Sequence, residues 1–318
     1  MKSYGSDPVR AWRFPGGRSY SRTVTAQLID GQAIATDIRS EVAARAAALA
    51  ARGATPGLAV FLVGDDPASI SYVTGKAKAC AEAGIFSETF HLPADTPQAE
   101  VLALIRRLNA DPRFHAILPQ LPMPPQVNDS AVIDAMDSAK DADGLHPVNL
   151  GRLLRGELTG AIPCTPNGVL QLLARTGNDP AGKHVVVIGR STLVGRPIAV
   201  LLSNKAKGAN ATVTICHTGT PDIGRHSRDA DIVVIAAGRP HTLTAGMVRD
   251  GAVVIDVGTN RIEDATRKRG WRLVGDSDFN ELREKCSWIT PVPGGVGPMT
   301  IAMLLVNTVN AAERAAAG

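Results

Sequence analysis

The chain has 318 residues, of which 44% are hydrophobic, 20% are charged and only 4% are aromatic. This length allows about two domains, and the composition excludes a disordered chain and predicts a core of aliphatic residues. No apolar run reaches the roughly 18 residues that a membrane-spanning helix needs. The four cysteines are widely spaced and form no C-x-x-C pair, which argues against a disulfide scaffold or a zinc finger. We therefore expect a protein of a reducing compartment, the cytoplasm, with no membrane partner and no metal site.

The net charge of +4 belongs to the first 24 residues, which contain five basic residues and one acidic residue. The rest of the chain carries 29 basic and 29 acidic groups, so it has no charge excess that would favour nucleic acid. Residues 1–24 show no helical or strand periodicity and are predicted to be a disordered tail. Three interpretations of this tail stay open, namely a flexible appendage or over-long start, a transit peptide, and an arm that binds nucleic acid.

The first half of the chain alternates between helical and strand patterns. Apolar residues at helical spacing in an Ala-rich stretch predict a helix that ends near Gly53. The apolar run Gly57–Val63 predicts a buried strand. The pattern then predicts a helix over about 69–83, a strand near 86–91, a helix over about 97–110 and a short strand at 116–118. Such alternation indicates βαβ units and a mostly parallel sheet.

The alternation restarts after a loop-rich stretch, residues 141–168, which is predicted to contain a domain boundary. Strands are predicted at 184–188, 212–216, 232–236 and 253–257, with a helix from about 195. The final helix, about 298–314, is expected to fold back onto the first half. The predicted fold class is therefore α/β with two domains, the second a Rossmann-like, doubly wound nucleotide-binding domain.

A glycine turn after the strand at 184–188 carries the signal for a dinucleotide. Gly189-Arg190-Ser191 follows the strand, and Gly195 opens the next helix. Such a turn places free backbone N–H groups and the positive end of a helix beside a pyrophosphate. The spacing is not G-x-G-x-x-G, so an ordinary strand-to-helix turn stays an alternative.

The ends of the other strands refine this prediction. The strand at 212–216 runs into His217-Thr218 without the carboxylate that usually holds an unphosphorylated ribose, which favours NADP over NAD. Gly238 and Thr259 follow two further strands, where small residues let a cofactor approach the backbone. Tight turns without a ligand are the alternative for both.

Ser69, Tyr72 and Lys76 are spaced by three and four residues, so they share one face of the predicted helix over about 69–83. A lysine that is shielded from water has a lowered pKa and can act as an acid or a base near neutral pH. A hydroxyl, a phenol and an amine side by side therefore form a set that can handle protons. On spacing alone, a solvated lysine beside a half-buried tyrosine stays the alternative.

Together these residues resemble the bifunctional methylenetetrahydrofolate dehydrogenase/cyclohydrolase (FolD-type) family, from about Ile29 to Ala311. The resemblance depends on several separated segments in the right order. They are Gly64–Ser69 leading into Tyr72-Val73 and Lys76, Gln120-Leu121-Pro122, Lys140-Asp141-Ala142-Asp143-Gly144, Pro163-Cys164-Thr165-Pro166, Gly189-Arg190-Ser191 with Val194-Gly195, and Pro291–Pro298.

The resemblance implies an enzyme of one-carbon folate interconversion. It would oxidise 5,10-methylenetetrahydrofolate to 5,10-methenyltetrahydrofolate with NADP+ and then hydrolyse the product to 10-formyltetrahydrofolate. Residues 25–147 and 293–318 would form the folate-binding catalytic domain and residues 148–292 the NADP-binding domain. The family is usually dimeric, so a homodimer without a nucleic-acid partner is expected.

The resemblance also assigns roles to matching positions. Lys76 would be the catalytic lysine, Tyr72 would orient the folate, and Gln120 would position Lys76. Asp143 would hold the pterin ring, whose adjacent N–H donors pair with a carboxylate. The remaining implied residues are Ser69, Pro293, Gly294 and Gly295 on the substrate side, and Gly189, Arg190, Ser191, Gly195, His217, Thr218, Gly238 and Thr259 on the cofactor side.

Three positions depart from the family pattern. Gly75 precedes the lysine where a larger residue is usual, Pro119 precedes Gln120 where an aliphatic residue is usual, and Thr218 replaces a common serine. Pro119 removes a strand hydrogen bond and makes the placement of Gln120 the point to check. The alternatives are a dehydrogenase with little cyclohydrolase activity or with NAD, a non-catalytic nucleotide-binding module with a tail for nucleic acid, and a generic amino-acid or hydroxy-acid dehydrogenase.

Overall fold

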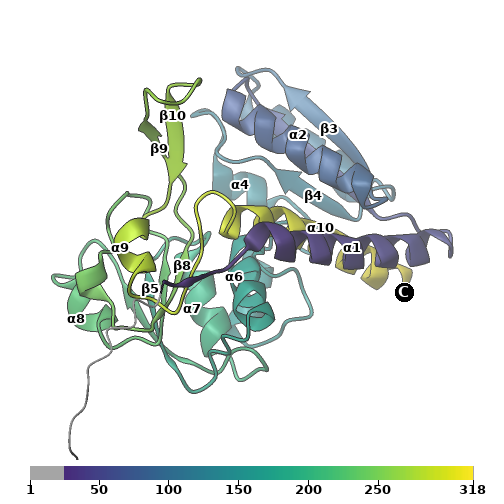
Figure 1. Ribbon diagram of the computed structural model, residues 1–318. Helices are drawn as coiled ribbons and strands as arrows, with labels where there is room; N and C mark the ends of the chain where they lie inside the picture. Colours follow the sequence, from purple (N-terminus) through teal and green to yellow (C-terminus); the bar gives the residue numbers. More distant parts are fainter. Residues whose placement is uncertain (1–24, 318) are drawn as a thin grey trace, which may run out of the picture.

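Two parallel sheets form the frame of residues 25–317, the part of the chain that this computed structural model describes (Figure 1). The predicted tail, residues 1–24, lies outside the described residues. In Figure 1 the sheet from the first half lies beside α2, and the sheet from the second half lies among α7, α8 and α9. The two-domain α/β fold class is therefore confirmed.

The first sheet has the order β3-β2-β4, with all pairs parallel. Its strands are β2 (Gly57–Val63), β3 (Phe86–Leu92) and β4 (Ala116–Pro119), and its helices are α2 (Pro67–Glu82) and α3 (Gln98–Ala110). Leu58 and Val60 of the central strand pack in the core cluster that contains Val73 of α2, whereas Phe61 packs in another cluster with α3. The predicted alternation is confirmed, and the element ends agree to within two residues.

The second sheet has the order β1-β11-β8-β7-β5-β6, again with all pairs parallel. Four of its strands match the prediction: β5 (His184–Ile188), β6 (Thr212–Cys216), β7 (Ile232–Ile235) and β8 (Val253–Asp256). The short strands β11 (Trp288–Ile289) and β1 (Gln27–Leu28) extend it at one edge. The helices of this half are α6 (Cys164–Arg175), α7 (Gly195–Ser203), α8 (Ile223–Ser227) and α9 (Phe279–Arg283). The periodicity gave no sign of β1, because two residues are too few to show a period.

Two long helices join the sheets. The helices α1 (Gly31–Ala50) and α10 (Val296–Ala316) lie side by side between the two halves of the molecule (Figure 1). The Arg45 guanidinium of α1 donates to Glu313 of α10 at 3.0 Å, and α10 also packs on α6. The predicted return of the last helix onto the first half is confirmed, and the same helix contacts the second half as well.

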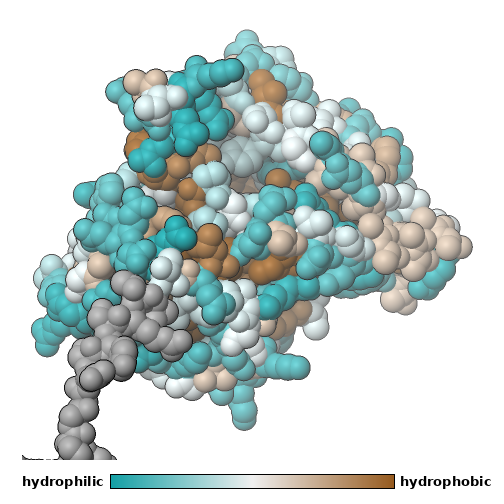
Figure 2. Space-filling view, viewed as in Figure 1, coloured by the Kyte–Doolittle hydropathy of each residue, from teal (hydrophilic) through white to brown (hydrophobic). Residues whose placement is uncertain are grey.

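A hairpin and three short helices complete the described chain. The antiparallel strands β9 (Asn260–Glu263) and β10 (Trp271–Val274) rise from the second sheet toward the side of α2 (Figure 1). The helices α4 (Asp129–Asp134) and α5 (Pro147–Leu154) and a 3-10 turn at Ala245–Met247 lie in connections. Figure 2 shows hydrophobic side chains in the hollow between the hairpin and the first half. No helix among residues 25–317 is both long enough and apolar enough to cross a bilayer.

Candidate functional site

The lysine predicted from helical spacing contacts the glutamine that follows β4. Asp66 caps α2 by accepting the Ser69 N–H at 2.8 Å, which places Ser69 in the first turn. Tyr72 and Lys76 follow one and two turns later on the same face. The Lys76 Nζ donates to Gln120 Oε1 at 2.9 Å, so the half-buried ammonium points to the carboxyl end of β4.

Gln120 is itself held firmly although Pro119 precedes it. Its backbone N–H donates to Phe61 O at 2.8 Å, and its Nε2 donates to Leu121 O at 3.0 Å. The Gln120 N–H points to β2, so the nitrogen of Pro119 faces the other side of β4, the edge strand of this sheet, where its missing N–H costs no bond to β2. Proline at position 119 therefore does not prevent the Gln120 side-chain oxygen from accepting the hydrogen bond from Lys76.

Lys76 and Asp143 influence each other's protonation in a site that is largely shielded from water. Burial lowers the pKa of Lys76, and the negative charge of Asp143 partly opposes this effect. Burial raises the pKa of Asp143, and the positive charge of Lys76 partly opposes that effect. Both shifts favour the neutral forms, so a proton can leave the lysine at a lower pH than in water.

The thiols near Lys76 carry no charge. Burial raises the pKa of Cys80 to about 12 and raises the pKa of Cys164 well above its ordinary value. All four cysteines of the chain are buried and unpaired. Asp143 is therefore the carboxylate that acts on Lys76, with no thiolate competing for its proton.

The loop that carries Asp143 is fixed by its neighbour Asp141. Asp141 is 3% exposed and accepts hydrogen bonds from the Gly144 N–H at 2.9 Å, the His146 N–H at 2.8 Å and Asn149 Nδ2 at 2.9 Å. Gly144 has a φ of 75°, and a Cβ there would lie 2.4 Å from the Ile162 carbonyl carbon. The glycine of this motif is thus required by both conformation and space.

Asn307 of α10 joins this loop to the segment before α6, and sequence reasoning missed it. Its Nδ2 donates to Ala142 O at 2.9 Å and to Ile162 O at 2.8 Å, and the residue is 3% exposed. The signal available for it was an asparagine among the apolar residues of a helix near the end of the chain. The last helix therefore supports Asp143 from behind.

Tyr72 faces a depression on the proline- and glycine-rich loop before α10. This depression has a volume of about 410 Å³ and is lined by Tyr72, Thr259 and the whole segment 291–298, which includes Pro293, Gly294 and Gly295. Tyr72 is 54% exposed, so its ring is available to a ligand. The structure thus brings the predicted substrate residues Tyr72, Pro293, Gly294 and Gly295 together, and Thr259 with them.

A second pocket of about 520 Å³ gathers the residues predicted for the cofactor. It is lined by Gly189, Arg190, Ser191, His217 and Thr218. The φ of Gly189 is 135°, and a Cβ there would lie 2.3 Å from Ala236 O, so only glycine fits. Such a bare turn lets a phosphate approach the backbone. The chain therefore fits a dinucleotide at this point.

The polar rim of this pocket suits an extra phosphate. Arg190 Nη1 lies 3.4 Å from His217 Nε2, and no carboxylate stands among the lining residues. The Ser191 hydroxyl accepts from the Val194 N–H at 3.1 Å, which closes the turn before α7. A guanidinium beside an imidazole and hydroxyls is a set that binds a dianion.

Asp276 organises the end of β7 and was not singled out from the sequence. It is completely buried, and its Oδ2 accepts from the Ala237 N–H at 2.7 Å and the Gly238 N–H at 2.8 Å. Its Oδ1 accepts from Asn260 Nδ2 at 2.8 Å. Gly238, predicted to bind the cofactor, is thus held by Asp276 next to the lining residues Ala237 and Arg239.

Asp256, at the end of β8, is the second carboxylate that was missed. It is 2% exposed and accepts from the Gly258 N–H at 2.9 Å, the Asp276 N–H at 3.0 Å and the Ser277 N–H at 2.8 Å. Burial raises its pKa, although these hydrogen bonds oppose the change. The two aspartates join the loops of both pockets. The signal available in the sequence was an aspartate at or just after the end of a strand, with a glycine within two residues.

Three predicted residues lie at the margins of these pockets. Ser69 donates its hydroxyl to Asp66 at 2.9 Å, and Gly195 packs against Gly189, since a Cβ on Gly195 would lie 2.2 Å from Gly189 O. Thr259 lines the depression with Tyr72 instead of the pocket with Arg190. Their roles with a ligand stay predictions.

Comparison with known proteins gives consistent matches. The chain matches the family descriptions "Tetrahydrofolate dehydrogenase/cyclohydrolase, catalytic domain" over residues 29–143 and "Tetrahydrofolate dehydrogenase/cyclohydrolase, NAD(P)-binding domain" over residues 163–316. A curated protein from Chlorobium luteolum, the bifunctional protein FolD, is 52% identical over 290 residues, which cover 91% of this chain and 98% of that protein.

Two solved structures resemble the described fold over nearly their whole length. The bifunctional enzyme FolD from Campylobacter jejuni, a methylenetetrahydrofolate dehydrogenase/cyclohydrolase, has a TM-score of 0.86 and 46% identity, covering 91% of this chain and 99% of its own. The N5,N10-methylenetetrahydrofolate dehydrogenase-cyclohydrolase from Trypanosoma brucei, complexed with NADP cofactor and inhibitor, has a TM-score of 0.86 and 41% identity, covering 92% and 99%.

Replacing the buried Asp276 tests the part it plays in holding the cofactor loop. In Asp276→Asn the amide can no longer accept from all three donors, so we expect the free energy of unfolding to fall by about 3 kcal/mol. Urea denaturation measures this change, and dinucleotide binding to the folded variant should weaken in parallel. The exposed Asp229→Asn is the matched control, and equal stability of the two variants would contradict the assignment.

Proposed function

The chain belongs to the tetrahydrofolate dehydrogenase/cyclohydrolase family, and we propose that it oxidises 5,10-methylenetetrahydrofolate with NADP+ and hydrolyses the resulting 5,10-methenyltetrahydrofolate to 10-formyltetrahydrofolate. The observation that carries this proposal is the shielded hydrogen bond from Lys76 to Gln120, with Asp143 in electrostatic range. A lysine held in this way is suited to proton transfer, which the hydrolysis needs and a plain nucleotide-binding module does not.

The oxidation is mainly a problem of alignment. A hydride leaves the carbon bridge between N5 and N10 of the folate, and both nitrogens stabilise the cation that forms, so no strong base of the protein is required. The nicotinamide supplies the hydride acceptor when the cofactor is bound. The chain contributes position, because Asp256 and Asp276 hold the loops that line the folate-side depression and the cofactor pocket.

The hydrolysis requires the chain to move a proton. Water adds to the methenyl carbon, and the bond from that carbon to N5 breaks while N5 takes a proton. The neutral Lys76 amine accepts the proton that the attacking water loses and can return it to N5. The remaining hydroxyl proton is released to solvent as the C=O bond of the formyl group forms. Gln120 fixes the amine in place. Burial lowers the pKa of Lys76, so a larger fraction of the amine is neutral at a given pH.

The remaining residues recognise the two ligands. Asp143 would accept the adjacent N–H donors of the pterin, and Tyr72 would stack on the folate against the loop with Pro293, Gly294 and Gly295, with Ser69 at the start of the same helix face. Arg190, Ser191 and Thr218 would surround the 2′-phosphate of NADP, with His217 beside them. Gly189, Gly195, Gly238 and Thr259 would border the cofactor.

The domain division, assembly and compartment belong to the same proposal. Residues 25–147 with 293–318 would bind folate and residues 148–292 would bind NADP, even though β1 pairs with the sheet of the second half. The chain would act as a homodimer in the cytoplasm. Leu154 is 72% exposed and Val148 is 44% exposed, so apolar surface is available for a partner.

Sedimentation equilibrium is expected to give twice the chain mass.

Lys76→Met tests the proposed hydrolysis. The variant lacks the group that moves protons, so we expect methenyltetrahydrofolate hydrolysis to slow at least about 100-fold. The oxidation needs no lysine base and should keep a substantial part of its rate. A spectrophotometric assay of the methenyl absorbance, with methylenetetrahydrofolate and NADP+ as reactants, reads both steps.

Lys78→Met is the matched control, because Lys78 lies on the same helix but is exposed beside Glu82. The pH profile gives a second check. The base is the neutral amine, so the enzymatic hydrolysis should rise with pH and level off at a pH below the 10.5 of a free lysine, after subtraction of the uncatalysed rate. A Lys76→Met variant with full hydrolysis would remove the lysine from this role.

Arg190→Ala tests the preference for NADP. Loss of a charge-assisted hydrogen bond to the 2′-phosphate should raise the KM for NADP about 10- to 100-fold and leave the KM for NAD nearly unchanged. Steady-state rates with each cofactor measure the two constants. Arg225→Ala, an exposed arginine outside the pocket, serves as control. Equal changes for both cofactors would show that Arg190 does not read the phosphate.

A further inference from the structure

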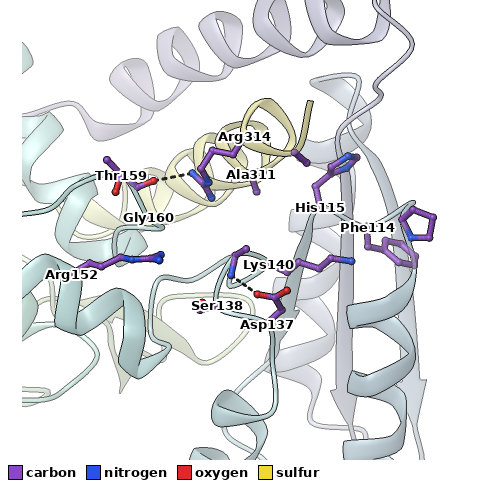
Figure 3. A pocket seen from close by; sticks show the side chains of 13 residues that line it. Phe114, His115, Asp137, Ser138, Lys140, Arg152, Thr159, Gly160, Ala311 and Arg314 are labelled. Atoms are coloured by element: carbon purple, nitrogen blue, oxygen red, sulfur yellow. Dashed lines mark hydrogen bonds between the residues drawn. The ribbon is translucent and has the colours of Figure 1, made fainter. Parts of the chain in front are cut away.

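A third cavity, of about 550 Å³, lies outside the site described above (Figure 3). It is bordered by the residues just before β4, by the loop around Lys140, by α5 with the loop after it, and by the end of α10. His115 precedes β4 at its amino end, whereas Gln120 follows β4 at its carboxyl end. This cavity and the Lys76 site therefore lie at opposite ends of β4, so a ligand in one leaves the other free.

Two arginines reach into this cavity without a carboxylate to neutralise them. Arg152 comes from α5 and Arg314 from α10, and neither has an acidic oxygen within 4.0 Å among residues 25–317. Their hydrogen bonds within the chain are long, from Arg152 to Asn149 Oδ1 and from Arg314 to Thr159 O, each at 3.4 Å. Glu313, the neighbour of Arg314, is already bound by Arg45.

The two guanidiniums lie close enough to repel each other. Partial burial lowers the pKa of Arg314, the positive charge of Arg152 lowers it further, and the negative charge of Glu313 partly opposes these effects. Like charges that act on each other in this way cost free energy unless an anion binds near them. In Figure 3 both side chains extend into the same space, with the His115 ring across from them.

The other polar groups of the cavity add donors and leave little negative charge. His115 Nδ1 accepts the Gly57 N–H at 3.1 Å, so the neutral ring carries its proton on Nε2. Burial lowers the pKa of His115, and the charge of Lys140 adds to this. The Lys140 ammonium donates to Leu108 O and Asp111 O, which use two of its three N–H donors, and its positive charge adds to that of the cavity. Asp137 is the one carboxylate in the lining.

We propose that this cavity is a binding site for a small phosphate monoester, with Arg152 and Arg314 as its main donors. The forked donors of two guanidiniums match the oxygens of a tetrahedral dianion better than lysines do. Ala311 lines the cavity beside Arg314, the largely buried Phe114 lines it on the opposite side, and the volume exceeds that of phosphate alone. The organic part of the ligand would therefore contact this apolar lining, while the phosphate binds the arginines.

Isothermal titration calorimetry with inorganic phosphate and phenyl phosphate tests this site. Saturating NADP is present throughout, so that the pocket with Arg190 cannot bind the probe. We expect one saturable site per chain and tighter binding of phenyl phosphate than of phosphate. Arg152→Gln and Arg314→Gln should each weaken binding about tenfold. Arg155→Gln, an exposed arginine paired with Glu157 outside the cavity, should leave it unchanged.

Thermal unfolding of the same variants without a probe separates ligand binding from a structural role. The two arginines repel each other, so replacing either should leave the melting temperature unchanged or raise it. Absence of a saturable site, equal binding by the Arg152→Gln/Arg314→Gln double variant, or a marked fall in its melting temperature would overturn the proposal. Tighter binding of citrate than of phenyl phosphate would assign the cavity to polycarboxylates and would also overturn it.

Discussion

The hydrogen bond between the Lys76 ammonium and the Gln120 amide oxygen sets the position of everything else in the candidate site. It requires α2 and β4 to be neighbours of the same central strand, β2, so that a helix face and a strand end converge. The hydrogen bonds from the Gln120 backbone N–H to Phe61 O and from its Nε2 to Leu121 O fix the side chain so that Oε1 is directed at Lys76. A proton-transfer group that is both shielded and held in one place is the physical basis of the proposed hydrolysis.

Buried carboxylates hold the rest of the site in shape. Asp141 fixes the loop that presents Asp143, and Asp256 and Asp276 fix the loops at the ends of β7 and β8. Each of the three accepts several N–H donors, so the cost of burying its charge is offset by hydrogen bonds within the chain. The buried polar side chains thus hold the loops in position, while aliphatic side chains form the hydrophobic core around the two sheets.

Charge in this protein acts locally. Beyond residue 24 the chain is neutral in total, yet Arg190 lines the cofactor pocket, which has no carboxylate in its lining. Arg152 and Arg314 both line the cavity near α10. Arg113, in contrast, is fully engaged with Asp111 and Glu88 on the surface. An arginine without an acidic partner keeps its positive charge available to a ligand, whereas the carboxylate of an ion pair neutralises that charge.

The sequence by itself determined the alternation of strands and helices, the glycine turn after β5 and the shared face of Ser69, Tyr72 and Lys76, because periodicity and glycine conformation are local properties of the chain. Through the resemblance it also named Gln120 and Asp143. Only the tertiary structure decided that Lys76 meets Gln120 despite Pro119, that Asn307 and Asp276 support the loops, and that β1 pairs across the molecule. These contacts join residues far apart in the chain, and no local pattern encodes the distance between them.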